Sequence, residues 1–210
     1  MTDVLSRILV YGDQIELKLR IKNPHGFIDW SEEKFDYVKY NFRKDVARWG
    51  LSITSLDGEL SGVPDLDSLK EYNLENGTHI KETDCNQTTI VYEHPDIKSL
   101  IGPFADHMTR SHILKLGPSG FFPPHRDSWW TTSTTFRLIV PMKNTNPRNG
   151  CHFMLEDKVL HWNEGSVYFL NTSKVHTLFN ASFEDSYWIV FNILNNEETF
   201  ELLMQNLAIV

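Results

Sequence analysis

The stretch LKLGPSGFFPPHRD, residues 114–127, places a histidine and an aspartate two positions apart behind apolar and turn-forming residues. In an extended strand, successive side chains point to opposite faces, so His125 and Asp127 would share one face and Arg126 the other. Such a pair can be a polar turn between two strands, or it can supply two ligands to one metal ion. The metal hypothesis requires a third ligand from elsewhere in the chain.

Short β-rich segments follow one another from Ser111 onward. They are separated by turn-forming sequences such as GPSG, TNPRNG and ASFED. About eight strands at this regular spacing are typical of a β-sandwich or barrel. The segments span residues 111–118, 121–127, 134–144, 150–157, 159–163, 165–171, 174–180 and 186–194.

The sequence before Ser111 is mixed and contains both strand and helix patterns. Alternation in IELKLRIK, residues 15–22, predicts a half-buried strand. Apolar residues at helical spacing predict a helix over residues 31–50, with Ser31 as its N-cap and Gly50 at its end. The amphipathic sequence NEETFELLMQNL predicts a closing helix near the C-terminus.

We expect a single domain over residues 1–210, because no internal repeat or low-complexity linker divides the chain. A mixed helical and irregular region, residues 1–110, would pack on a jelly-roll core, residues 111–195. A C-terminal helix, residues 196–210, would follow. The predicted fold is therefore mainly β with N-terminal helices, in a cupin-like jelly roll.

The composition excludes several classes of protein. Hydrophobic residues make up 40% of the chain, which is typical of a globular protein. The formal net charge of −8 argues against a large nucleic-acid-binding surface. No apolar run approaches the roughly 20 residues that a membrane-spanning helix needs. Cys85 and Cys151 form no CxxC pattern and no signal peptide is recognisable, so we expect a cytoplasmic protein.

The distal histidine of the segment KVHTLFN, His176, is a candidate for the third ligand. Enough chain separates it from His125 to run through several strands and return beside the first. The chain has nine histidines, and by number alone His152 and His161 are equally possible third ligands. Two histidines and one carboxylate on one face of an octahedron form the facial triad of non-haem Fe(II) oxygenases.

The segments around these residues resemble a known family. They are LKLGPSGFFPPHRD, FRLIVPMKNTNP, HFMLEDKVLHWNEGSVYFLNTSKVHTLFNAS and YWIVFNI. Across residues 92–193 the sequence is similar to the aspartyl/asparaginyl β-hydroxylases and to the related bacterial free-proline hydroxylases. Both belong to the Fe(II)/2-oxoglutarate-dependent oxygenases. The most specific motifs are LGPSG-x-x-PPHRD, the arginine-led strand that ends in Pro141, and W-x-x-G-x-x-x-x-x-N before the distal histidine.

The resemblance implies a double-stranded β-helix in which His125, Asp127 and His176 bind Fe(II). It implies a dioxygenase that uses 2-oxoglutarate and O₂ to hydroxylate an amino acid, free or within a peptide, with no catalytic residue beyond the metal ligands. Some members of the family lack the carboxylate ligand, whereas this chain has Asp127. A carboxylate at this position argues against a halogenase, which needs the position for halide.

The distal carboxylate of 2-oxoglutarate needs a cation, and the guanidinium fork of arginine matches it best. The family usually places an arginine on the strand after the distal histidine, at a position that falls here on Ser186. No lysine or arginine follows Lys174. Arg137, an arginine within an otherwise apolar strand, is the predicted substitute, with Ser186 adding a hydroxyl contact. The alternative is that Arg137 pairs with a structural acid.

Arg126, Trp129 and Trp130 are candidates for binding the substrate because they lie next to the ligand pair. If the strand continued, the two tryptophans would face opposite ways and at most one would line the site. Two other functions are compatible with the sequence. One is a cupin-like metal enzyme that does not use 2-oxoglutarate, which Ser186 favours. The other is a non-catalytic jelly-roll binding module.

Overall fold

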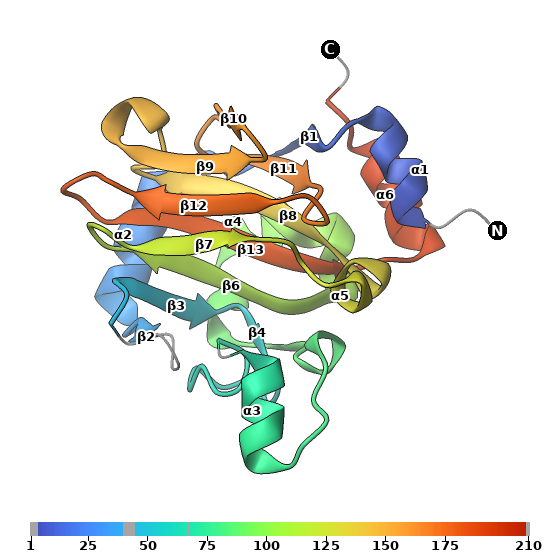
Figure 1. Cartoon of the computed structure of the whole chain (residues 1–210), viewed down its shortest axis with the longest axis horizontal. Helices are drawn as coiled ribbons and strands as arrows, with labels where there is room; N and C mark the ends of the chain where they lie inside the picture. Colours follow the sequence, from blue (N-terminus) through green and yellow to red (C-terminus); the bar gives the residue numbers. More distant parts are fainter. Residues whose placement is uncertain (1–3, 40–44, 67, 209–210) are drawn as a thin grey trace.

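Two β-sheets face each other in a sandwich (Figure 1). The structure, a computed structural model, describes residues 4–39, 45–66 and 68–208, with only the backbone of Trp129 and Trp130. The larger sheet has seven strands in the order β1-β11-β8-β13-β6-β3-β2, and the smaller has four in the order β10-β9-β12-β7. The predicted jelly roll is confirmed.

Strands overlap all eight segments predicted after Ser111, although in the segment 159–163 the strand ends at Val159. They are β6 (Met108–Leu116), β7 (Phe121–His125), β8 (Thr135–Lys143), β9 (Cys151–Leu155), β10 (Lys158–Val159), β11 (Ser166–Leu170), β12 (His176–Asn180) and β13 (Ser186–Leu194). The earlier part of the chain adds further strands: β1 (Gln14–Arg20), β2 (Val38–Lys39), β3 (Arg48–Ser52) and a separate pair, β4 (Thr54–Ser55) with β5 (Gln87–Thr88).

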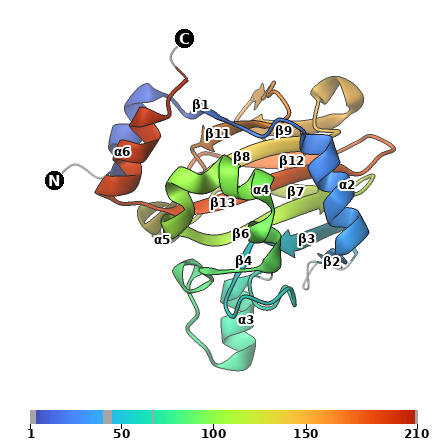
Figure 2. The same ribbon diagram turned by 180° about the vertical axis from the view of Figure 1, so that it is seen from behind.

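Helices α2 and α4 cover the outer face of the large sheet, as Figure 2 shows, while α6 lies beside α1 at one end of the sheet. Within the described part of the chain, no helix is long and apolar enough to cross a membrane. The helices are α1 (Val4–Ile8), α2 (Pro24–Lys34), α3 (Leu69–Asn76), α4 (Pro95–Ile101), α5 (Trp129–Thr134) and α6 (Glu197–Gln205). The last of these is the closing helix that the sequence predicted.

The large sheet separates two apolar cores. Phe136, Leu138 and Val140 of β8 pack on its helix-covered side. Ile139 points the other way, into the core between the two sheets. Side chains of β8 therefore alternate between the two faces of the sheet, and Arg137 points toward the interior of the sandwich.

The helix predicted over residues 31–50 is wrong. Asn23 caps α2, its side chain accepting a hydrogen bond from the amide of Gly26, and the helix ends at Lys34. Ser31 lies inside this helix and donates to the carbonyl of Ile28. Gly50 lies in β3, which pairs with β6. Pairing with the sheet has overridden a helical pattern that the sequence carries locally.

The N-terminal region is thus less helical than expected, because it supplies three strands of the large sheet. β1 pairs with β11, and β3 pairs with β6. In β1, Ile15, Leu17 and Leu19 are the more buried positions, as the alternation predicted. The strand β3 lies beside the opening between the two sheets and so brings residues from before the jelly-roll core to the site described below.

Gly120 allows the turn that leads into β7 to pack closely against the preceding segment. A Cβ atom at this position would lie 2.2 Å from the carbonyl oxygen of Ala47 and 2.8 Å from that of Gly117. Both obstacles are backbone atoms, so we expect Gly120→Ala to destabilise the fold by about 1–3 kcal/mol. Thermal unfolding followed by circular dichroism measures this loss.

Lys70→Ala is the control, because Lys70 is an exposed residue of α3 and alanine is the better helix former. Its melting temperature should equal or exceed that of the wild type. Equal melting temperatures for Gly120→Ala and wild type would contradict the packing argument.

Candidate metal centre

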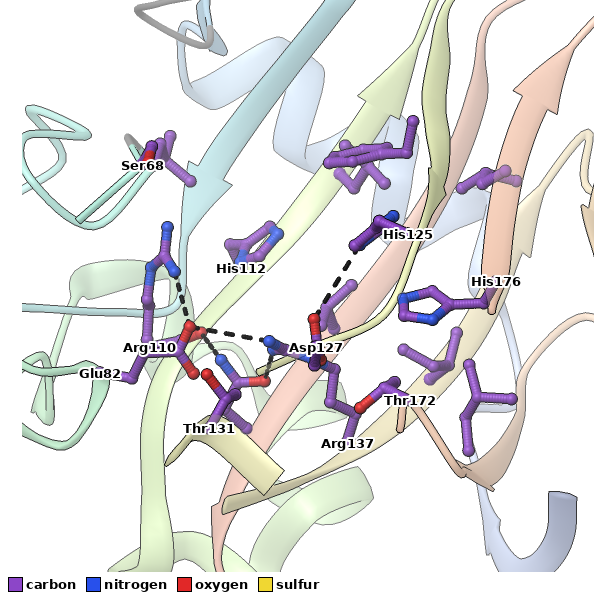
Figure 3. A pocket seen from close by; sticks show the side chains of 18 of the residues that line it. Ser68, Glu82, Arg110, His112, His125, Asp127, Thr131, Arg137, Thr172 and His176 are labelled. Atoms are coloured by element: carbon purple, nitrogen blue, oxygen red, sulfur yellow. Dashed lines mark hydrogen bonds and ion pairs between the residues drawn. The ribbon is translucent and has the colours of Figure 1, made fainter. Parts of the chain in front are cut away.

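Three potential ligands come together at the open edge of the small sheet (Figure 3). His125 ends β7, His176 begins β12, and the two are direct cross-strand partners. Asp127 lies two residues beyond the end of β7, where its amide donates to the carbonyl of Thr172. One ligand atom from each residue lies within 4.8 Å of the other two. The three residues that the family resemblance implies as ligands therefore form one cluster.

Backbone carbonyls fix the orientation of both imidazoles. Nδ1 of His125 lies 2.8 Å from the carbonyl of Pro123, and Nδ1 of His176 lies 3.0 Å from that of Lys174. A carbonyl can only accept a hydrogen bond, so each Nδ1 carries the proton. The lone pair is then on Nε2 of each ring, which is the arrangement that metal-binding histidines use.

Asp127 is held as a carboxylate by its neighbour Arg137. Its Oδ2 accepts a hydrogen bond of 2.5 Å from Nε of Arg137. Burial alone would raise the pKa of Asp127, but the charge and hydrogen bond of Arg137 outweigh it and lower that pKa to about 2. Its Oδ1 faces His125 Nε2 at 3.9 Å. One oxygen is thus tied to the protein and the other faces the histidines.

The donor set fits a divalent transition metal. Burial lowers the pKa of His176, which keeps its imidazole neutral and able to donate a lone pair. With an ionised Asp127 and a correctly oriented His125, the cluster offers two imidazoles and one carboxylate. This is the donor set of the 2-His-1-carboxylate iron sites, which leaves other coordination positions open.

A cavity of about 420 Å³ lies between the two sheets and includes the cluster in its wall. This volume lies in the range of small-molecule sites. Part of its wall is apolar and includes Leu114, Phe122, Ile139, Phe153, Leu170, Leu178 and Val190. Another part is polar or charged and includes Ser68, Glu71, Glu82, Arg110, Thr131 and Thr172.

Arg137 lines this cavity, and its fork contacts acids and amides of the protein. Besides Asp127, its Nη1 donates to the side-chain oxygen of Asn192, and its Nη2 lies 3.7 Å from Glu82 Oε1. The structure thus places Arg137 beside the metal cluster as the partner of an acid, which was the alternative to a cosubstrate anchor.

A second arginine, Arg48, reaches the cavity from the start of β3 and was missed from the sequence. Its side chain is buried, and its guanidinium carbon lies 4.0 Å from the centre of the Phe122 ring. That ring stacks at 6.4 Å on His125. The distance between the guanidinium and the His125 ring cannot exceed the sum of these two distances. The guanidinium therefore lies within about 10 Å of that ring. Because a helix was predicted over residues 31–50, nothing in the sequence indicated that Arg48 would lie at the cavity.

Ser186 does not line the cavity. It begins β13 and pairs with Leu116, whereas Asn192 of the same strand lies in the cavity wall. Ser186 is fully buried outside the cavity wall, although its partner Leu116 also pairs with Arg48, which does line the cavity. A contact between Ser186 and a ligand in this cavity is therefore not supported by its position.

Of the three predicted substrate residues, only Arg126 has a described side chain. Arg126 is exposed and lies outside the cavity wall. The side chains of Trp129 and Trp130 lie outside the described part of the structure. Their backbone forms the start of α5, because β7 ends at His125. The alternation of a continuing strand therefore does not apply to them. Thr131 of α5 does line the cavity.

The two alternative histidines lie away from the cluster. His152 stacks on Phe179 with ring centres 5.2 Å apart. Neither His152 nor His161 lines the cavity or belongs to the cluster of potential metal ligands found among the described residues. The cross-strand pairing with His125 is what distinguishes His176.

Comparison with solved structures supports the fold. A 2OG-Fe(II) oxygenase family oxidoreductase from Burkholderia pseudomallei aligns over 92% of this chain and 90% of its own, with a TM-score of 0.50 and 12% identity. The viral collagen prolyl hydroxylase of Paramecium bursaria Chlorella virus-1 aligns over 88% of this chain and 95% of its own, with a TM-score of 0.46 and 10% identity.

Curated proteins gave no match to the chain. The family model described as aspartyl/asparaginyl beta-hydroxylase matches residues 68–195. This match covers more than half of the sequence, including β6 to β13 and all three residues of the metal cluster. The chain therefore belongs to the aspartyl/asparaginyl β-hydroxylase family of hydroxylating oxygenases.

Proposed function

We propose that this protein is an Fe(II)- and 2-oxoglutarate-dependent dioxygenase that hydroxylates an amino acid, free or within a peptide. The observation that carries the proposal is the cluster of His125, Asp127 and His176 in the wall of a cavity. Family membership supports the class of reaction, and the cluster supports the metal.

When bound, Fe(II) and 2-oxoglutarate supply the O₂-dependent oxidation, in which the keto acid loses CO₂ and becomes succinate. The chain provides the surroundings. Pro123 and Lys174 carbonyls orient the two imidazoles, and Arg137 keeps Asp127 ionised with one oxygen toward the histidines. The apolar wall behind them excludes water from the reacting groups.

Arg48 is our candidate for binding the distal carboxylate of 2-oxoglutarate. It is an arginine of the cavity wall, and stacking on Phe122 holds its guanidinium within about 10 Å of the His125 ring. An extended five-carbon diacid spans roughly 5 Å between its carboxyl carbons, given C–C bonds near 1.5 Å. A molecule of this size can reach from the metal cluster toward Arg48.

Calorimetric titration of the anaerobic Fe(II) protein with 2-oxoglutarate tests the cosubstrate. We expect saturable binding of 2-oxoglutarate. This binding should disappear when a chelator removes the metal, because the metal would bind the keto-acid end of 2-oxoglutarate. Succinate release over a panel of amino acids and short peptides then tests the reaction, with the chelated protein as the blank. No binding at millimolar 2-oxoglutarate would favour a cupin-like metal enzyme with a different chemistry.

A further inference from the structure

One loop holds two of the three potential metal ligands in place. It joins β11 to β12 and spans residues 171–175. The carbonyl of Thr172 accepts a hydrogen bond of 2.9 Å from the amide of Asp127. The carbonyl of Lys174 lies 3.0 Å from Nδ1 of His176. The conformation of this loop therefore sets both the backbone position of Asp127 and the orientation of the His176 ring.

Asn171 organises this loop from its first position. Its side-chain Oδ1 accepts hydrogen bonds from the amide and the hydroxyl of Ser173, at 3.2 and 2.5 Å. Its carbonyl accepts a hydrogen bond of 3.3 Å from the amide of Lys174. An asparagine that bonds to the backbone two residues further on stabilises a turn. The shape of the loop thus depends on how Asn171 itself is held.

Asp13, the residue before β1, holds Asn171 from outside the jelly-roll core. Its Oδ1 accepts a hydrogen bond of 2.7 Å from Nδ2 of Asn171, and its carbonyl accepts another of 2.7 Å from the Asn171 amide. Its Oδ2 lies 2.8 Å from Nζ of Lys174. Asp13 therefore contacts the loop on both sides of Thr172, although it does not line the cavity.

The hydrogen bond from Asn171 should contribute more to this hold than the ion pair with Lys174. The side chains of Asp13 and Lys174 are 40% and 36% exposed, so water screens their attraction. Asn171 is buried, and its amide donates to a charged acceptor, which makes the stronger kind of hydrogen bond. Hydrogen bonds from Lys174 and Asn171 lower the pKa of Asp13, so its carboxylate is ionised at neutral pH.

The motif W-x-x-G-x-x-x-x-x-N, which ends in Asn171, contacts β1 or its ends at each of its fixed residues. Nε1 of Trp162 donates a hydrogen bond of 2.7 Å to Oε1 of Gln14. The carbonyl of Gly165 accepts from the amide of Ile21, and a Cβ atom at Gly165 would lie 2.6 Å from the Ile21 carbonyl oxygen. The motif thus joins β1 to the strand that leads into the loop.

We infer that Asp13 is a positioning residue of the metal centre. Through Asn171 it fixes the loop whose carbonyls place Asp127 and orient His176. The segment before the jelly-roll core therefore takes part in building the site. This rests on the proposed function, because it concerns the metal that the function requires. Asp13 lies outside the cavity wall, so it acts on the geometry of the ligands and not on the substrate.

The test is a titration of the full-length protein with Co(II). Co(II) stands in for Fe(II), and its visible absorption depends on the geometry of its ligands. Asp13→Ala removes both side-chain contacts, so the absorption spectrum should change. We expect binding to weaken roughly 3- to 10-fold, less than the roughly 10- to 100-fold that loss of a direct partner of a ligand costs, because Asp13 acts through a loop.

Two further variants separate positioning from a general loss of stability. Asp13→Asn keeps a side-chain oxygen that can accept from Asn171, so it should restore most of the affinity and a spectrum close to that of the wild type. Asp29→Ala is the matched control, because Asp29 also joins the N-terminal region to a jelly-roll strand, through an exposed ion pair of 2.6 Å with Lys143 outside the cavity wall. It should leave the affinity and the spectrum unchanged.

Circular dichroism shows which variants are folded, and Asp13→Ser replaces Asp13→Ala if the alanine variant does not fold. A wild-type spectrum and affinity in the folded variant would overturn the inference. An equal change in Asp29→Ala would do the same, as would an Asp13→Asn protein as impaired as Asp13→Ala. These results leave the proposed function standing, because the wild type still binds the metal. A wild-type protein that binds no Co(II) contradicts the proposed function itself, and the inference with it.

Discussion

Replacing Asp127 with alanine should lower the affinity for Fe(II) by more than about 100-fold. Loss of a hydrogen-bond partner of a ligand alone costs up to roughly that factor, and here a ligand itself is lost. The change also leaves Arg137 without its 2.5 Å carboxylate contact at a mostly buried position, which adds an electrostatic cost. Two imidazoles alone would have to hold the ion.

Anaerobic calorimetry with Fe(II) measures this affinity, and Co(II) provides an air-stable absorption spectrum of the same site. Asp157→Ala is the matched control, since Asp157 is an exposed turn residue away from the cavity. Circular dichroism shows whether the variant is folded. Wild-type affinity in a folded Asp127→Ala protein would refute the assignment of the ligands.

Arg137→Lys should weaken metal binding roughly 10- to 100-fold, as changes to the partners of metal ligands do. Lysine keeps the positive charge but cannot donate at once to Asp127 and Asn192 from the two fixed positions that Nε and Nη1 occupy. Asp127 would then be free to turn, and its second oxygen would compete for the ion. The affinity for Co(II) and the Co(II) absorption spectrum measure both effects.

Arg48→Lys provides the matched comparison because it changes the other deeply placed arginine of the cavity. We expect it to weaken binding of 2-oxoglutarate at saturating metal while the metal affinity stays near that of wild type. The reverse pattern, with Arg137→Lys affecting only 2-oxoglutarate, would restore Arg137 as the cosubstrate anchor and reject its role in positioning Asp127.

Much of the jelly roll could be predicted from the sequence, because its strands carry strong local signals. Turn-forming sequences separate the segments that carry these strands. The helix over residues 31–50 failed for a different reason. Its apolar residues have helical spacing, but pairing of Arg48–Ser52 with β6 decided the outcome for the described end of this segment.

The spacing of His125 and Asp127 together with the family resemblance predicted the ligands, but not the residues that surround them. Arg48 and Glu82 come from segments far from the histidines in sequence, and only the fold brings them to the cavity. The position of Ser186 illustrates the same limit. Counting residues from His176 placed it in the pocket, whereas the course of β13 places Val190 and Asn192 there.

The direct pairing of His125 with His176 has a consequence for stability. Among the described strands, β7 is the last of the small sheet and pairs with β12 alone. An ion bound between these two histidines would cross-link the edge strand to this neighbour. Because a ligand that binds only the folded state stabilises it, this edge would loosen first under iron limitation. The supply of iron would then govern the lifetime of the protein as well as its turnover.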